Sequence, residues 1–336
     1  MKKDILILGI ESSCDDTSVA VVKNGREVLS NVISSQIDIH KIYGGVVPEI
    51  ASRNHTKNIK YCLDEALSRA GVKMDDISAI AVTYGAGLLG ALIVGVSFAK
   101  ALSYTSGKPL FAVNHIEGHI SANFLAHKNL EPPFLCLVVS GGHTALFKME
   151  SHTKKTLIKT TADDAIGEAF DKVARECGLT YPGGPSIQRE AQNGTPCIKF
   201  TKNDYKNTEN FSYSGLKTAV INYIHNAKQR KVNYSVPDIC ASFQEEAVMQ
   251  LVESVDEEIK KTGLKRIVLA GGVSANLHLR KKLEERLNPI GVEVIYPPII
   301  LCTDNAAMIA SQGYFNLIEG VKPAGLDLAP KSTINL

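Results

Sequence analysis

Short continuous runs of hydrophobic residues alternate along the chain with longer segments whose apolar positions recur at a helical period. Such short runs are typical of strands buried on both faces of a sheet. We predict strands at residues 5–10, 17–22, 26–33, 78–83, 111–114, 134–139, 145–149, 266–270 and 292–298. We predict helices at residues 48–71, from Gly90 through Lys100, from His115 onward, at 166–178, 184–193, 214–229 and 237–262, after Asn276, and at 303–317. This alternation favours mixed α/β layers.

The pattern restarts near the middle of the chain. Each half opens with an apolar strand, a polar turn and a second strand; the turns are ESSCDDT at 11–17 and SGGHT at 140–144. A duplicated fold with two such polar loops suggests a nucleotide held in a cleft between two domains. We therefore predict an N-terminal lobe at 1–130, whose last part carries the helix at about 110–130, and a C-terminal lobe at 131–336. In this prediction, the final helix, at 303–317, can pack on the N-terminal lobe although it belongs to the C-terminal segment.

Composition narrows the class of protein only moderately. The 336 residues are 44% hydrophobic and 21% charged, with a net charge of +2, which suits globular domains with no overall polyanion preference. The seven cysteines are dispersed and form no CxxC pair, as expected of a reduced, intracellular protein. The apolar run near the start is too short for a secretory signal, and we expect no segment to approach the length of a membrane span. These features predict a cytoplasmic protein.

Two polar loops are candidates for substrate chemistry. In ESSCDDTS, small side chains allow backbone N–H groups to approach a phosphate, and Asp15 or Asp16 could act as a base or hold a metal-bound water. In SGGHT, Gly141 and Gly142 allow close backbone approach. The alternatives are an ordinary acidic hairpin turn and a tight β-turn.

Three further segments fit a nucleotide site. GGVSAN at 271–276 could lay a flat ring on glycine backbone beside Asn276; alternatively, Ser274 caps the next helix. Its spacing is not that of a Rossmann fingerprint, and no Walker sequence is present. The Asp171 carboxylate could accept hydrogen bonds from ribose hydroxyls; alternatively, it lies on a solvated helix face. YPGGP at 181–185 could line a pocket, or be only a turn.

The sequence HIEGH places His115 and His119 four residues apart, so both imidazoles project from one helix face and can reach one cation. The zinc-protease motif has its glutamate directly after the first histidine, whereas Glu117 is turned away from the shared face. Asp304 is our candidate third ligand, with helix capping as its alternative role. Two histidines and one carboxylate suit iron or zinc and leave positions open for a ligand that contains phosphate.

Ten motifs occur in the order found in the TsaD family, which formerly bore the names Gcp and O-sialoglycoprotein endopeptidase. The resemblance covers about residues 7–315 and is carried by GIESSCDDTSVAVV, GGVVPEIASRNH, VTYGAGLLGALIVG, VNHIEGHI, LVVSGGHT, AFDKVAR, YPGGP, FSYSGLKT, GGVSAN and TDNAAM. SGGHT resembles the bacterial branch. The other branch has a tyrosine before this loop that can touch the metal; Val138 stands there, so no tyrosine ligand is expected.

The resemblance implies an actin-like, sugar-kinase-like duplicated α/β fold with an interdomain nucleotide cleft. It implies transfer of threonylcarbamoyl from threonylcarbamoyl-adenylate to N6 of adenosine 37 in tRNAs that read codons beginning with A. By motif match, the metal ligands are His115, His119 and Asp304. The residues that bind the adenylate, ATP or ADP are Val138, Val139, Ser140, Gly141, Gly142, Asp171, Gly184 and Asn276. One divalent metal is expected, with Fe(II) favoured and Zn(II) as the alternative.

The resemblance also implies partners, namely TsaB and TsaE, with a TsaC or Sua synthase supplying the adenylate. If TsaB docks on the N-terminal domain, apolar surface on the helices at about 48–71 or 88–104 should be exposed. The basic stretches Lys228–Lys231 and Lys154–Lys155 are candidates for tRNA contact, or are solvated surface. Rival functions are a metallopeptidase, a non-catalytic ATP-binding switch and, more weakly, a sugar kinase.

Overall fold

The computed structural model describes residues 4–201 and 209–334, and its chain divides by internal contacts into two units. Unit 1 comprises Met1–Pro132, Glu150–Lys155 and Pro297–Leu336. Unit 2 comprises Pro133–Met149 and Thr156–Tyr296. The lobes at 1–130 and 131–336 stay a prediction.

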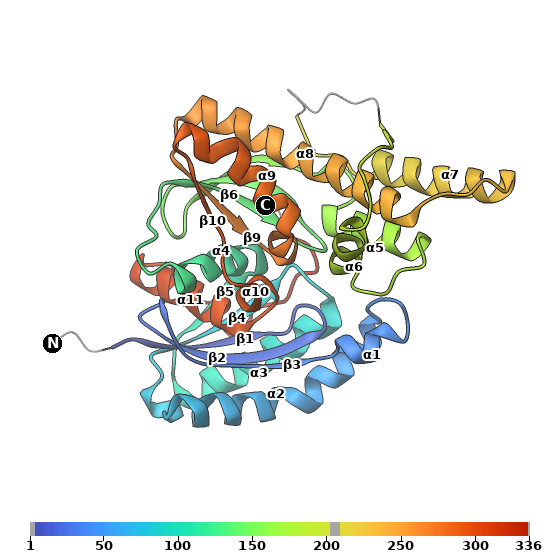
Figure 1. Cartoon of the computed structure of the whole chain (residues 1–336). Coiled ribbons are helices and arrows are strands. Elements are labelled where there is room, and N and C mark those ends of the chain that lie inside the picture. Colours follow the sequence, from blue (N-terminus) through green and yellow to red (C-terminus); the bar gives the residue numbers. More distant parts are fainter. Residues whose placement is uncertain (1–3, 202–208, 335–336) are drawn as a thin grey trace. The chain divides into compact units, whose positions relative to one another are not determined.

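Unit 1 contains a five-stranded mixed sheet in the order β3-β2-β1-β4-β5 (Figure 1). Its strands are β1 (Leu6–Glu11), β2 (Asp16–Lys23), β3 (Glu27–Ser35), β4 (Ala79–Gly85) and β5 (Leu110–Asn114). β1 and β2 pair antiparallel, as do β2 and β3, whereas β4 runs parallel to β1 and β5. The predicted turn between β2 and β3 is confirmed: Asn24 and Gly25 both have positive φ, as the tight hairpin requires.

Helices cover both faces of this sheet, because successive strand residues point to opposite sides. Leu8 and Ile10 pack with α2 (Pro48–Ala70) and α3 (Leu89–Ser106). Ile7, which precedes Leu8 and points to the opposite face, packs with α11 (Ala306–Ile318) in the core that also includes α4 (His115–Ala126). Short helical segments are α1 (Ile37–Lys41), η1 (Met74–Asp76) and α10 (Ile299–Cys302). α4 and α11 therefore lie against the same face of the sheet.

Unit 2 repeats the strand arrangement in the order β10-β9-β6-β7-β8. Its strands are β6 (Phe134–Val139), β7 (Thr144–Met149), β8 (Lys155–Thr160), β9 (Arg266–Ala270) and β10 (Glu293–Ile295). Its helices are α5 (Ile166–Glu176), α6 (Gly183–Ala191), α7 (Ser214–Arg230), α8 (Val236–Thr262), η2 (Gly272–Ala275), α9 (Leu277–Leu287) and η3 (Asn288–Ile290). β6 is antiparallel to β7 and parallel to β9, matching the relation of β1 to β2 and β4.

The predicted strands and long helices are confirmed to within a few residues. The structure differs from the predictions in some short elements, in the end of α3 and in the length of its apolar segment. α1, α10 and β8 were not predicted, because they are short or polar. α3 continues beyond Lys100 to Ser106, where Gly107 ends it with positive φ. The expectation that no segment has the length of a membrane span is wrong for α3. Its 18 residues have a mean hydropathy of 1.3, although one such helix is weak evidence for a membrane.

Candidate metal centre and substrate loops

The structure brings His115, His119 and Asp304 together in unit 1. Their possible ligand atoms all lie within 4.8 Å of one another. Asp304 Oδ1 is 3.4 Å from His115 Nε2 and 3.3 Å from His119 Nε2. For a metal about 2.1 Å from each ligand, neighbouring ligand atoms stand about 3.0–3.4 Å apart. The spacing therefore fits a single divalent cation.

Two local features of the chain set this geometry. Asn114 caps the start of α4 by accepting a hydrogen bond from the Ile116 N–H, which places His115 in the first turn. A Cβ at Gly118 would lie 2.6 Å from Ile309 Cδ1, so α4 and α11 pack closely here and a larger residue would require the Ile309 side chain to move. The alternative role of Asp304 as a helix cap is wrong. Asn305 caps α11 by accepting from the Met308 N–H, and the Asp304 carboxylate remains available.

A further carboxylate, Glu11, lies behind His115 and is fully buried. Burial would lower the pKa of His115, yet Asp304 and Glu11 raise it well above its usual value. Burial would likewise raise the pKa of both carboxylates, but His115 holds each below its usual range. The site therefore favours a positive charge between two carboxylates, which a bound divalent cation also supplies.

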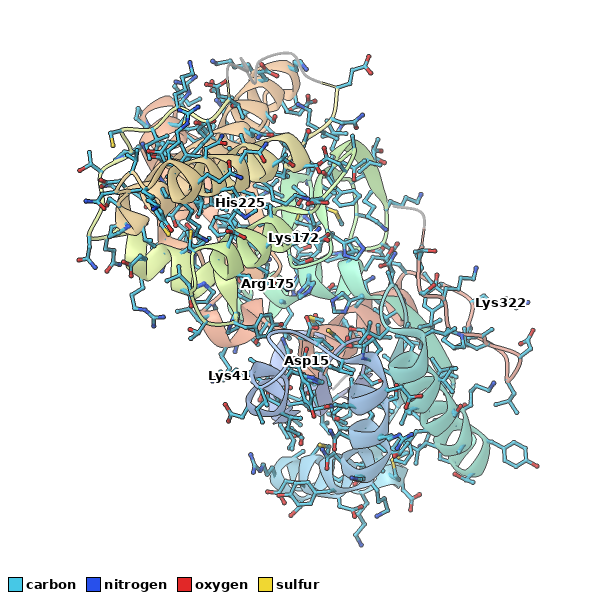
Figure 2. The ribbon with its side chains drawn as sticks, turned by 90° about the vertical axis from the view of Figure 1, so that its right-hand side faces the viewer. Asp15, Lys41, Lys172, Arg175, His225 and Lys322 are labelled. Atoms are coloured by element: carbon cyan, nitrogen blue, oxygen red, sulfur yellow. The ribbon has the colours of Figure 1, made fainter. Side chains whose placement is uncertain are left out.

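The loop with the two candidate bases is held by a buried histidine on α2. His55 Nε2 donates to the Cys14 carbonyl at 2.9 Å, and its Nδ1 accepts from the Thr17 hydroxyl at 2.7 Å. Asp16 lies at the end of this loop, where burial raises the pKa of its carboxyl to about 7. Asp16 Oδ1 is buried and has no hydrogen-bond partner among the described residues. Asp15 is on the same loop, and Figure 2 labels it.

Glu117, the residue on which a peptidase mechanism would depend, forms an ion pair with Lys155. This contact agrees with the sequence argument that Glu117 points away from the face shared by the two histidines. It also gives Lys155 a structural partner, so the stretch Lys154–Lys155 is a weaker candidate for tRNA contact than its sequence suggests.

The second polar loop, SGGHT in unit 2, has free space beside its glycines, whereas side chains surround the first loop, ESSCDDT. A Cβ added at Gly141 or Gly142 would meet no atom within 4 Å. The loop is held by two internal contacts: Ser140 N–H donates to the His143 carbonyl, and Ser140 Oγ accepts from the His143 N–H. Gly167, at the start of α5, packs so tightly that its Cβ would lie 2.5 Å from the Ser140 carbonyl oxygen. The loop is thus packed against α5 at Ser140, and it has free space beside Gly141 and Gly142.

Other predicted substrate residues of unit 2 lie in distinct environments. Asp171 accepts a hydrogen bond from the Gly183 N–H at 2.7 Å, which ties α5 to the start of α6, where Gly184 also lies. Burial raises the pKa of the Asp171 carboxyl. Gly184 has open space where a side chain would be. The side chains of Val138 and Val139 are fully buried in β6, so a ligand could reach only their backbone.

Asn276, and not Ser274, caps the helix that follows GGVSAN. Its Oδ1 accepts from the Leu279 N–H at 2.9 Å, and its Nδ2 donates to Gln244 Oε1 at 3.0 Å. The alternative, in which Ser274 caps this helix, is therefore wrong. Since both ends of the Asn276 amide are engaged, any ligand contact must share these hydrogen bonds.

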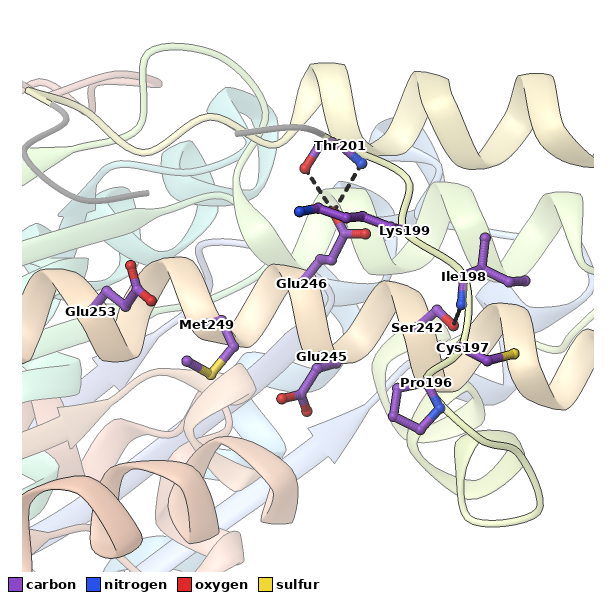
Figure 3. Close-up of a pocket in the computed structure, with 10 residues that line it drawn as sticks. All are labelled: Pro196, Cys197, Ile198, Lys199, Thr201, Ser242, Glu245, Glu246, Met249 and Glu253. Carbon is purple, nitrogen blue, oxygen red and sulfur yellow. Dashed lines mark hydrogen bonds between the residues drawn. The ribbon is translucent and has the colours of Figure 1, made fainter. Parts of the chain in front are cut away.

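Sequence reasoning missed Glu11, His55 and a groove along α8. Glu11 and His55 lie within recognised motifs, but only their contacts identify them as supports of the candidate site. The groove measures about 370 Å³ and lies in unit 2 (Figure 3). One wall is a stripe of α8 that includes Glu245, Glu246 and Glu253, and the other is the segment 196–201. It contains none of the predicted site residues.

Comparison with known proteins now decides the family. The family model for TsaD, described as tRNA N6-adenosine threonylcarbamoyltransferase, matches residues 27–311. This chain belongs to the TsaD family. A tRNA N6-adenosine threonylcarbamoyltransferase of Clostridium perfringens is 55% identical over 317 residues, covering 94% of each chain. One of Clostridium botulinum is 51% identical over 330 residues, covering 98% of this chain and 97% of the relative.

Solved structures with low sequence identity show the fold of this chain. Full-length HypF in its phosphate- and nucleotide-bound form matches with a TM-score of 0.65 at 15% identity, covering 96% of this chain and 48% of HypF. Component A of the Acidaminococcus fermentans (R)-2-hydroxyglutaryl-CoA dehydratase matches with a TM-score of 0.55 at 15% identity, covering 94% and 99%. A ROK family protein from Streptococcus pneumoniae matches with a TM-score of 0.53. The predicted actin-like, sugar-kinase-like α/β class is confirmed.

Proposed function

We propose that this chain transfers the threonylcarbamoyl group from L-threonylcarbamoyladenylate to N6 of adenosine 37 in tRNAs that read codons beginning with A. Membership of the TsaD family supports the reaction and the tRNA substrate. The observation that carries the proposal in the structure is the cluster of His115, His119 and Asp304, which offers two imidazole nitrogens and one carboxylate at the spacing of a metal site.

The three side chains fit Fe(II), which we favour, and Zn(II) as the alternative. Two histidines with one carboxylate are typical of catalytic iron and zinc sites that keep positions open for another ligand. A bound metal would act as a Lewis acid that polarises an oxygen of the donor and stabilises developing negative charge. The contribution of this chain is to hold the ligands at fixed spacing, since α4 and α11 are packed closely at Gly118.

The donor is a mixed anhydride and is already activated, so the chain need not provide a strong nucleophile. Its task is to orient the donor carbonyl near the tRNA amine and to accept a proton. Asp16 suits this second role better than Asp15, because its pKa of about 7 is close to that of an effective base at neutral pH. Single-turnover transfer by Asp15→Asn and Asp16→Asn separates the two. A normal rate in both would reject either aspartate as the base.

The adenylate, or ATP or ADP, would bind at the glycine loops of unit 2. Gly141, Gly142 and Gly184 leave open space, and backbone N–H groups without a neighbouring Cβ suit phosphate oxygens. Asp171 would accept from ribose hydroxyls, while its bond to Gly183 keeps it in place. Ser140, Asn276 and the backbone of Val138 and Val139 complete the proposed set.

The surface of α5 and α7 is the proposed contact for tRNA phosphates. These helices pack on each other, and Figure 2 labels Lys172, Arg175 and His225 on them. Arg175 is exposed, as are Arg230 and Lys231 at the end of α7. Lys228 is tied to Glu176 at 3.0 Å, so the stretch Lys228–Lys231 is anchored at one end.

A partner of the TsaB kind would dock on α2 and α3 of unit 1. The predicted apolar exposure is present there: Tyr61 is 62% exposed and Tyr104 is 76% exposed, and Leu89 and Ile93 are also exposed. TsaE would complete the complex, and a TsaC or Sua synthase would supply the adenylate. We expect the chain to act in the cytoplasm, where these partners and tRNA meet.

The rival functions have less support. A metallopeptidase needs a carboxylate that activates water beside the metal, whereas Glu117 pairs with Lys155. An ATP-binding switch or a sugar kinase has no need for a histidine pair with a carboxylate beside it.

A reconstituted transfer assay tests the proposal. It combines the full chain, TsaB, TsaE, labelled threonylcarbamoyladenylate and a tRNA that reads ANN codons. Label should appear on the tRNA adenosine, should be lost with Asp304→Ala and should persist with the matched control Glu117→Gln. No label with folded protein and active partners would reject the transferase. Label that survives Asp304→Ala would reject the role of the metal.

A further inference from the structure

The two nitrogens of the His115 ring face different groups. Nε2 faces the Asp304 carboxylate and is the atom available to a metal. Nδ1 faces two oxygens on the other side of the ring: Glu11 Oε2 at 3.2 Å and Ser13 Oγ at 3.1 Å. A neutral imidazole that binds a metal through Nε2 must carry its proton on Nδ1 and needs an acceptor there.

Glu11 is fixed as an acceptor independently of His115. It ends β1, and its side chain is fully buried. Oε1 accepts from the Ser13 backbone N–H, and Oε2 accepts from the Thr83 hydroxyl at 2.6 Å. Thr83 lies on β4, which runs parallel to β1 in the same sheet. The carboxylate is therefore held from two sides before His115 is considered.

We propose that Glu11 is a positioning residue that accepts the His115 Nδ1 proton and so keeps Nε2 free to bind the metal. The inference rests on the proposed metal role of His115, His119 and Asp304. The sequence analysis gives Glu11 no individual role, since there it is only the first residue of the polar loop ESSCDDT. The carboxylate–histidine pair would fix both the orientation and the tautomer of the ring.

Ser13 Oγ is equally near, but it cannot enforce the same tautomer. A hydroxyl can donate as well as accept, so it would satisfy Nδ1 in either protonation state. An ionised carboxylate can only accept, so it selects the form with the proton on Nδ1. Glutamine at position 11 would lose this property. Its NH₂ group would face either the Ser13 N–H or the protonated His115 Nδ1. In both cases two hydrogen-bond donors would face each other, and one hydrogen bond would be lost.

The two histidines differ in this respect. His119 Nδ1 is buried and has no hydrogen-bond partner among the residues that the structure describes. Only the ring of His115, of the two, is held from behind by protein groups in the described parts of the chain. Removing the support should therefore weaken the site through His115 alone.

The test uses the full chain loaded with Zn²⁺ and three variants: Glu11→Gln, Thr83→Val and Ser13→Ala. Thr83→Val is the matched control, because it removes a buried hydrogen bond to the same Glu11 oxygen and leaves the carboxylate. Zinc affinity is measured by competition with a chromophoric chelator. The His115 ring is observed by ¹H–¹⁵N NMR, in which a proton on Nδ1 is seen directly.

We expect Glu11→Gln to weaken zinc binding by about 10–100-fold, the usual effect of removing such a partner. Thr83→Val loosens the Glu11 carboxylate but keeps it, so it should weaken zinc binding less than Glu11→Gln does, and Ser13→Ala should bind zinc as the unchanged chain does. The Nδ1 proton signal should be present in the unchanged chain and in Ser13→Ala, and shifted or lost in Glu11→Gln.

Two results would overturn the inference: zinc affinity and the Nδ1 signal unchanged in Glu11→Gln, or lost in Ser13→Ala instead. If Glu11→Gln does not fold, the signal in Ser13→Ala still decides between the two acceptors. Failure of the unchanged chain to bind zinc or iron at all would instead reject the proposed metal site, a separate outcome.

Discussion

The first hairpin loops of the two units follow the same strand arrangement yet are built in opposite ways. In unit 1, the loop between β1 and β2 is enclosed by buried side chains: Glu11, Ser13 and His55 hold it through hydrogen bonds. In unit 2, the loop between β6 and β7 is held mainly by contacts between Ser140 and His143, and its two glycines face open space.

The difference shows how one topology can provide two kinds of binding. A cation needs charged ligands at fixed spacing, so its loop must be filled and rigid. A phosphate or a flat ring needs backbone N–H groups and free volume, so its loop must be short of side chains. The duplicated strands position both loops, and the local residues decide which kind of ligand each can take.

The largest expected effect is the loss of metal in unit 1. Asp304→Ala removes a charged ligand and leaves His115 and His119 without their shared carboxylate. We expect it to weaken metal binding by more than the roughly 100-fold upper range for an outer partner. Metal content after dialysis against a chelator measures the effect. Glu117→Gln is the matched control on α4 and should retain metal; equal loss in both would contradict a specific site.

Substitutions of two glycines in unit 2 should distinguish a glycine that is needed for packing, Gly167, from one that lies beside free space, Gly141. Gly167→Ala places a Cβ against the Ser140 carbonyl oxygen and should reduce the free energy of unfolding by up to about 3 kcal/mol. Gly141→Val adds volume where nothing lies within 4 Å, so stability should hardly change.

Nucleotide affinity should be reduced more by Gly141→Val than by Gly167→Ala, the reverse of their effects on stability. Gly141→Val fills the space proposed for the ligand and should weaken the binding of an ADP probe by about tenfold or more. Urea unfolding and calorimetric titration of both variants provide the measurements. The comparison fails if Gly141→Val is unstable, or if it binds ADP as well as the unchanged chain.

Asp16 gives unit 1 a pH-dependent stability. Burial raises the pKa of this carboxyl from 3.8 to about 7 in the folded chain. Ionisation therefore opposes folding, and this contribution to the free energy of unfolding falls as the pH rises from about 4 to about 7. Between pH 5 and pH 8, the stability of Asp16→Asn should thus rise by about 2–3 kcal/mol relative to that of the unchanged chain. Urea unfolding of both proteins across this range would reveal a pH-independent difference if the idea is wrong.

The smallest effect is expected at the internal hydrogen bond of the second loop. Ser140→Ala removes the acceptor of the His143 N–H, and should lower the free energy of unfolding by about 1 kcal/mol. The matched change in unit 1, Ser12→Ala, removes a buried bond from Ser12 Oγ to the Ala91 carbonyl and should cost more. Thermal unfolding of the two variants compares them directly; a larger loss from Ser140→Ala would contradict the open nature of this loop.

The sequence was most informative where a period or a spacing is fixed by one element. The alternation of Ile7 with Leu8 and Ile10 predicts a strand buried on both faces, and the spacing of His115 and His119 predicts one shared helix face. The resemblance then links Asp304 to them across the chain. Short or polar elements such as β8 have no such period and were missed.

The supports of the site could not be predicted for a different reason. Glu11 contacts Thr83 and His115 only because β1, β4 and α4 are brought together by the fold. The Asn276 and Asn305 caps also depend on local backbone geometry, since several neighbouring polar residues could fill the same role in the sequence. Tertiary contacts, and not residue type, decide which polar side chain is free to bind.

The close packing of α4 against α11 has a consequence for the synthesis of the chain. His115 and His119 emerge early from a ribosome, whereas Asp304 and the helix that covers this face of the sheet follow only after all of the unit 2 sequence. An incomplete chain therefore lacks both a metal ligand and the cover for the apolar face of α4. Metal retention would thus distinguish chains that extend past Asp304 from shorter ones, which lack this ligand.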